Sequence, residues 1–119
     1  MSNEELSLFI DCFEKDPRVL FRILRKEAGI KLTMIMTGRR KIRGSKLLPN
    51  EVVRIQYAYC AYMILSRENG HKFARGWLLR GNMYLRDPAL AIRSYPSNKL
   101  FLVMNAVINC VKSSRGVIP

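Results

Sequence analysis

The stretch PNEVVRIQYAYCAYMILSRE, residues 49–68, decides the fold class of this chain. Pro49 favours a helix start, because the first turn of a helix does not need the N–H group that proline lacks. Asn69 and Gly70 favour the end of this helix, because both residue types are common just after the last helical turn. Apolar side chains surround the axis almost completely, which is typical of a helix buried on all sides; they are Val52, Val53, Ile55, Ala58, Tyr59, Ala61, Tyr62, Ile64 and Leu65. We therefore expect a long central helix with other elements packed around it.

Two helices are predicted before the central one, and a third element is ambiguous. A helix is expected over residues 3–15, with Leu6, Phe9, Ile10 and Phe13 at helical spacing. The pair Asp16-Pro17 predicts the start of a second helix over 17–28 that Gly29 ends. The segment 30–36 is compatible with a short helix or a strand, because it mixes β-branched and unbranched residues. Helix is the preferred alternative.

Helical patterns continue after residue 70. A shorter helix is expected from about His71 to Arg80, with a face of Phe73, Ala74, Trp77 and Leu78 packed on the central helix. Further helices are expected from Pro88 to near Tyr95 and over 97–113. The sequence thus predicts an all-α fold, a small multi-helix bundle.

Length and composition exclude several classes of protein. With 119 residues the chain fits one domain, or a small domain with a helical extension, and 49% hydrophobic residues argue against global disorder. The longest apolar stretches are shorter than the roughly 20 residues that span a bilayer. Glu4 and Glu5 near the start do not fit a secretory signal. We expect a soluble protein of the cytoplasm without membrane contact.

The reactive side chains give little support for catalysis. Cys12, Cys60 and Cys110 are odd in number and far apart, which fits neither a disulfide framework nor a metal site, so all three are expected to be buried thiols. His71 is the single histidine. No phosphate-binding glycine loop or catalytic motif occurs. We expect no metal, no cofactor and no enzymatic activity.

The net charge of +12 is large for a domain of this size and is unevenly distributed. Residues 1–16 carry five acids and one lysine, whereas residues 22–46 carry nine basic side chains and only one acid, Glu27. Five of these cations lie in the segment 38–46 with two glycines, which indicates an exposed loop. Packing like charges together costs energy unless an anionic partner binds there.

The helices expected over 17–28 and from residue 30 have the outline of a helix-turn-helix, separated by Ala28-Gly29-Ile30. In this interpretation Thr33, Met34 and Thr37 are candidates for contacts with base edges. Cationic side chains would contact phosphates or the minor groove; they are Lys31, Arg39, Arg40, Lys41, Arg43 and Lys46. The alternative is that two short helices joined through glycine are common in any bundle and that the cations are simply solvated.

Residues 47–119 resemble the toxin-binding half of the Xre/MbcA/ParS family of antitoxins, the partners of RES-domain toxins that consume NAD. The motifs occur in the order found in the family. They are Leu-Leu-Pro-Asn-Glu at 47–51, Phe-Ala-Arg-Gly-Trp-Leu at 73–78, Leu85 with Pro88-Ala89-Leu90 after a turn at Asn82, and a hydrophobic helix that closes on Arg115-Gly116-Val117. The family carries a helix-turn-helix ahead of this half.

The resemblance implies a homodimeric antitoxin that binds the DNA of its own promoter and blocks its cognate toxin. Residues 1–46 would form the helix-turn-helix-like nucleic-acid-binding part and 47–119 the helical partner-binding part. Trp77 and Leu78 would be the scaffold of the toxin-binding part, and Arg115, Gly116 and Val117 the tail that blocks the toxin. Two alternatives remain: a stand-alone phage or plasmid nucleic-acid-binding regulator, and an inhibitor whose basic face contacts a host protein but no DNA.

Overall fold

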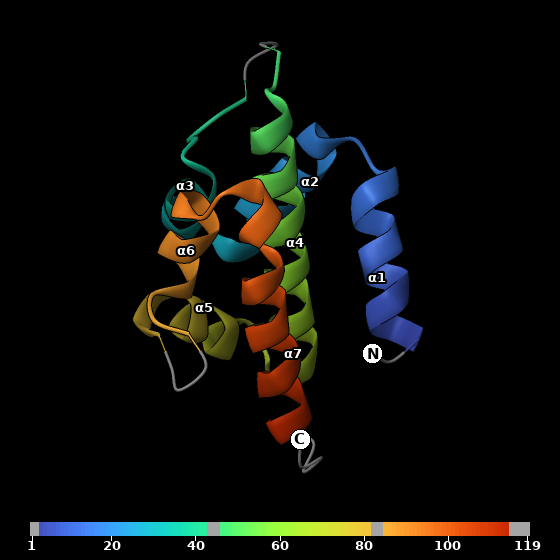
Figure 1. Ribbon diagram of the computed structural model, residues 1–119, viewed down its shortest axis with the longest axis vertical. Coiled ribbons are helices and arrows are strands. Elements are labelled where there is room, and N and C mark those ends of the chain that lie inside the picture. Colours follow the sequence, from blue (N-terminus) through green and yellow to red (C-terminus); the bar gives the residue numbers. More distant parts are fainter. Residues whose placement is uncertain (1–2, 43–45, 82–84, 115–119) are drawn as a thin grey trace.

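Helix α4 (Pro49–Asn69) runs through the centre of the molecule, and the other helices pack around it in the computed structural model (Figure 1). The structure describes residues 3–42, 46–81 and 85–114, without the side chains of 3–6, 8, 9 and 114. All regular elements of these residues are helical, which confirms the all-α prediction. The remaining elements are α1 (Asn3–Glu14), α2 (Pro17–Ala28), α3 (Ile30–Thr37), α5 (His71–Arg80), α6 (Pro88–Ser94), the 3₁₀ turn η1 (Ser97–Lys99) and α7 (Phe101–Ser114).

Proline and glycine set the helix boundaries. The Asp16 carboxylate accepts a hydrogen bond of 2.9 Å from the Arg18 N–H, so that α2 begins at Pro17 as predicted. Gly29 ends α2 with a φ of 93°, a backbone conformation that residues other than glycine rarely adopt. Gly70 separates α4 from α5 in the same way, with a φ of 89°. The sequence therefore predicts these boundaries correctly.

The ambiguous segment after Gly29 is a helix, as preferred from the sequence. Helix α3 packs against α2, α4 and α6, and this environment buries Leu32, Thr33, Met36 and Thr37. A strand would have needed a neighbouring strand to satisfy its backbone groups, and the described residues offer only helices.

Two local expectations are wrong, one about a buried side chain and one about where a helix begins. Ala74, Trp77 and Leu78 are buried in the core, but Phe73 is 39% exposed and does not belong to the buried face of α5. The segment expected as one helix over 97–113 begins with the separate turn η1, and α7 starts only at Phe101.

The expectation of three buried thiols is also wrong. All three cysteines are buried, but Cys12 of α1 and Cys60 of α4 form a disulfide that does not include Cys110. The two partners are 48 residues apart in sequence, and packing of α1 on α4 brings their Cα atoms to 6.7 Å. This pairing depends on the tertiary arrangement, and the spacing of the cysteines did not indicate it.

The two parts expected from the sequence, 1–46 and 47–119, share one hydrophobic core. Leu20, Leu24 and Met36 from the first part are fully buried in the same cluster as Ile55 and Val107 from the second. Within the described ranges, no helix is long and apolar enough to cross a membrane. The same residues contain no group of three side chains suited to a metal ion.

Candidate nucleic-acid interface

The segment that follows α3 is fixed to the start of α4 by an ion pair between Arg39 and Glu51. The Arg39 guanidinium donates from Nε and Nη2 to the two carboxylate oxygens of Glu51, with an Nη2 to Oε1 distance of 3.1 Å. The same carboxylate accepts the N–H of Leu48 at 3.1 Å, which caps the first turn of α4. The side chains of Arg39 and Glu51 are only 29% and 15% exposed. Arg39 is therefore occupied within the protein.

This contact favours the charged forms of both Arg39 and Glu51. The hydrogen bond from Arg39 lowers the pKa of Glu51 below its ordinary value, and the N–H of Leu48 acts in the same direction. The hydrogen bond to Glu51 raises the pKa of Arg39. Glu51 is the single acid between residues 28 and 67, so Arg39 neutralises the one carboxylate in this part of the sequence.

The cations around Arg39 are in a different situation. Lys31, Arg40, Lys41 and Lys46 are exposed, and none of them forms an ion pair with a carboxylate of the described residues. Arg93 of α6 joins them, because its Nε lies 3.4 Å from the position that a Cβ would take on Gly38, at the end of α3. We call these five side chains the basic surface.

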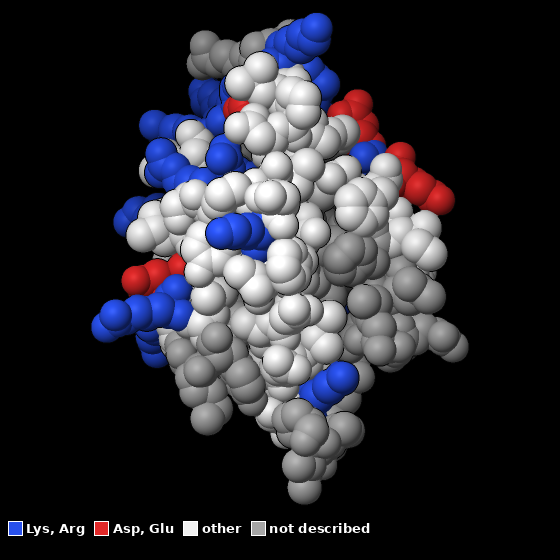
Figure 2. All heavy atoms as spheres, viewed as in Figure 1, with Lys and Arg blue, Asp and Glu red and all other residues white. Residues whose placement is uncertain are grey.

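The space-filling view agrees with this assignment. Lysine and arginine atoms gather on the side of the molecule where α3, α6 and the connection to α4 lie, while much of the surface over α7 is uncharged (Figure 2). Sequence reasoning missed Arg93, which is separated from the 31–46 segment by about half of the chain. Only the packing of α3 on α6 brings it there.

The side chains expected to contact base edges are mostly buried. Thr33 and Thr37 are 1% and 5% exposed, and the Thr37 hydroxyl donates a hydrogen bond of 2.7 Å to the Thr33 carbonyl. Neither threonine reaches the surface in this conformation. Met34 is 40% exposed and remains a candidate for a base contact, and Lys31 is exposed and remains a candidate for a phosphate or minor-groove contact.

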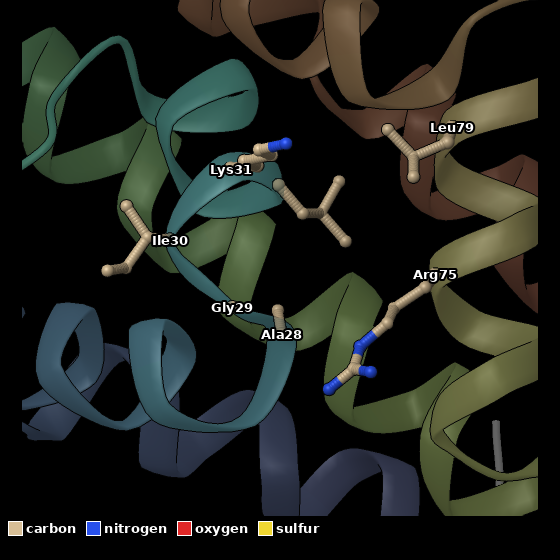
Figure 3. Close-up of a pocket in the computed structure, with 7 residues that line it drawn as sticks. Ala28, Gly29, Ile30, Lys31, Arg75 and Leu79 are labelled. Carbon is tan, nitrogen blue, oxygen red and sulfur yellow. The ribbon is translucent and has the colours of Figure 1, made fainter.

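A pocket of about 420 Å³ opens at the turn between α2 and α3 (Figure 3). Arg75 reaches into it from α5 and donates a hydrogen bond of 2.8 Å from Nη2 to the carbonyl of Glu27, near the end of α2. Because of this pocket, the first turn of α3 is accessible from solvent. The lining residues are Ala28, Gly29, Ile30, Lys31, Leu32, Arg75 and Leu79.

A buried tyrosine holds the end of α2 in place. The Tyr62 hydroxyl donates a hydrogen bond of 2.9 Å to the Glu27 carbonyl and lies 2.7 Å from Nδ1 of His71. Burial raises the pKa of Tyr62, so the hydroxyl keeps the proton that it donates. His71 Nε2 lies 3.7 Å from the Glu27 carboxylate. These contacts from α4 and α5 position the turn that leads into α3.

The remaining candidate residues do not lie on this surface. Trp77 and Leu78 are 6% and 0% exposed and belong to the core, which leaves them no direct contact with a partner in this conformation but is compatible with a scaffold role. Arg43 lies outside the described residues, as do Arg115, Gly116 and Val117.

Helix α7 presents a second kind of surface. Phe101 and Leu102 at its start are 50% and 42% exposed. Few charged atoms lie over α7 on the face that Figure 2 shows. Apolar side chains on other helices are exposed to a similar extent, for example Leu79 of α5 and Leu90 of α6.

Comparisons with family models, curated proteins and solved structures give no match for this chain. The class that the structure defines is an all-helical protein with a basic surface along α3.

Proposed function

We propose that this protein binds nucleic acid through the basic surface. The observation that carries the proposal is the separation of the cations into two groups. Glu51 neutralises Arg39, while Lys31, Arg40, Lys41, Lys46 and Arg93 face solvent without a carboxylate partner among the described residues. Such a surface binds the phosphate backbone and releases the counterions condensed on it.

Duplex DNA is the proposed ligand, with limited reading of its bases. Among the residues of α3 expected to contact DNA, Lys31 and Met34 are exposed, whereas Thr33 and Thr37 are buried. Phosphate contacts fix a protein on the duplex without reading sequence. We therefore expect binding that depends strongly on salt and weakly on sequence.

The more specific proposal is a homodimeric antitoxin that represses its own promoter and blocks a RES-like, NAD-consuming toxin. The resemblance of residues 47–119 to such antitoxins supports it, and so does the apolar surface of α7 with Phe101 and Leu102. The basic surface and the pair Phe101 and Leu102 share no residue, so DNA and a protein partner would use different side chains. A stand-alone phage or plasmid regulator would use the same basic surface.

Co-expression with the product of the adjacent gene tests the proposal. The chain is purified through a tag, and the sample is then used in gel shifts on the DNA upstream of its own gene. A stoichiometric complex that shifts this DNA is the result expected for the antitoxin. DNA binding without a complex would favour the stand-alone regulator, and a protein complex that leaves all DNA unshifted would contradict the proposed nucleic-acid function.

A further inference from the structure

A second pocket lies along α5, apart from the basic surface. Its volume is about 600 Å³. Lys72, Gly76 and Arg80 line it at intervals of four residues, which places them on one face of the helix. Phe73 and Trp77 lie next to them in the lining, with Asn69 and Gly81 at the two ends of the helix.

The fold gives no reason for glycine at position 76. Gly76 lies inside α5, where glycine destabilises a helix by about 1 kcal/mol relative to alanine. A Cβ atom there would meet only the guanidinium carbon of Arg80, at an ordinary contact distance of 3.9 Å. Alanine would therefore fit and stabilise the helix. A glycine at such a place suits a ligand that approaches the helix backbone closely.

The neighbouring side chains define the chemistry of that ligand. Lys72 and Arg80 are exposed and form no ion pair with a described carboxylate, so the pocket has a cation one turn before and one turn after Gly76. Phe73 exposes 39% of its surface beside them. An aromatic ring between two cations suits a ligand that combines a planar ring with phosphate.

We propose that this pocket binds a nucleotide, either free or as an unpaired nucleotide of a single strand. The base stacks on Phe73 above Gly76, and the phosphate lies at Lys72 or Arg80. An acidic peptide would use the two cations but would need neither the exposed ring nor the missing side chain. The inference does not depend on duplex binding by the basic surface, since the two sites share no residue.

The single tryptophan of the chain reports on this site directly, because Trp77 lines the pocket. Full-length protein is titrated with adenosine monophosphate and, separately, with a short oligothymidylate, and the change of Trp77 fluorescence is followed. We expect saturable quenching with at least one of them. Quenching by the mononucleotide points to a free nucleotide, and quenching by the oligonucleotide alone points to a single strand. No saturable change with either probe overturns the proposal.

Single-residue variants distinguish a loss of nucleotide binding from a loss of folding. Gly76→Ala should keep or raise the melting temperature and weaken binding, and Gly76→Leu should weaken it further. Phe73→Leu should cost about tenfold in affinity, at the lower end of the effect of losing a stacked base. Arg40→Ala serves as the matched control and should leave the quenching unchanged. Full affinity in both the Gly76→Leu and Phe73→Leu variants would overturn the proposal, while loss of duplex binding in the Arg40→Ala protein would not affect it.

Discussion

Replacing exposed cations of the basic surface should weaken the salt dependence of DNA binding, whereas replacing Arg39, which is paired with Glu51, should not. The triple variant Arg40→Ala, Lys41→Ala and Lys46→Ala removes three exposed cations without a carboxylate partner among the described residues. Each phosphate contact contributes about 0.9 to the slope of log affinity against log salt on a duplex. If all three residues contact phosphates, the slope becomes shallower by about 2.7.

The expected effect is large enough to measure by fluorescence anisotropy on a labelled duplex. Between about 50 and 200 mM salt, a slope difference of about 2.7 corresponds to roughly 40-fold in affinity, so the wild type should lose roughly 40-fold more than the triple variant over this range. Arg67→Ala is the matched control. Arg67 is an exposed cation near the other end of α4 from Glu51, and its loss should leave the slope unchanged.

Arg39→Ala should behave differently from its neighbours. Because Arg39 is bound to Glu51, its loss should leave the slope almost unchanged and lower the free energy of unfolding by about 1 kcal/mol. A slope that changes by the same amount for Arg39→Ala as for Arg40→Ala alone would refute the reasoning, because it would show that the ion pair does not keep Arg39 from the DNA.

Three further predictions concern stability. Reduction of the disulfide between Cys12 and Cys60 should lower the free energy of unfolding by about 4 kcal/mol, from the entropy of a loop that spans 48 residues, and coincident urea curves with and without reductant would disprove the bond. Glu51→Gln should lower the melting temperature above about pH 5. Because Arg39 depresses the folded pKa of Glu51, this difference should disappear as the pH falls below the ordinary value of 4.5, and a difference that persists in acid would contradict the assignment. Tyr62→Phe should cost about 1 kcal/mol in thermal unfolding, since the hydroxyl bonds both Glu27 and His71, and an unchanged melting temperature would argue against these bonds.

The sequence predicts the helices well where local signals act. Asp16 and Pro17 start α2, and Gly29 and Gly70 stop α2 and α4 regardless of what packs around them. The turn η1 is less accessible to such reasoning, because residues 97–99 directly follow Pro96, where an α-helix could also begin, and no glycine or proline separates them from Phe101.

The candidate site is predicted only in part, because distant segments decide which side chains remain exposed. The charge pattern correctly indicated exposed cations at Arg40 and Lys41. It could not show that Arg39 pairs with Glu51 twelve residues later. Nor could it show that Thr33 lies on the buried face of α3, since α3 is short and packs on α6, which comes about 50 residues further along the chain.

The most direct test of the central claim is to map the binding site by NMR. Isotopically labelled full-length protein is titrated with a duplex from upstream of its own gene, and the shifts of the backbone amides are followed. The account predicts that the largest changes occur at Lys31, Arg40, Lys41, Lys46 and Arg93, with little change in α1 or α7. Changes concentrated in α1 or α7, or no changes at low salt, would contradict the proposal that the basic surface binds nucleic acid.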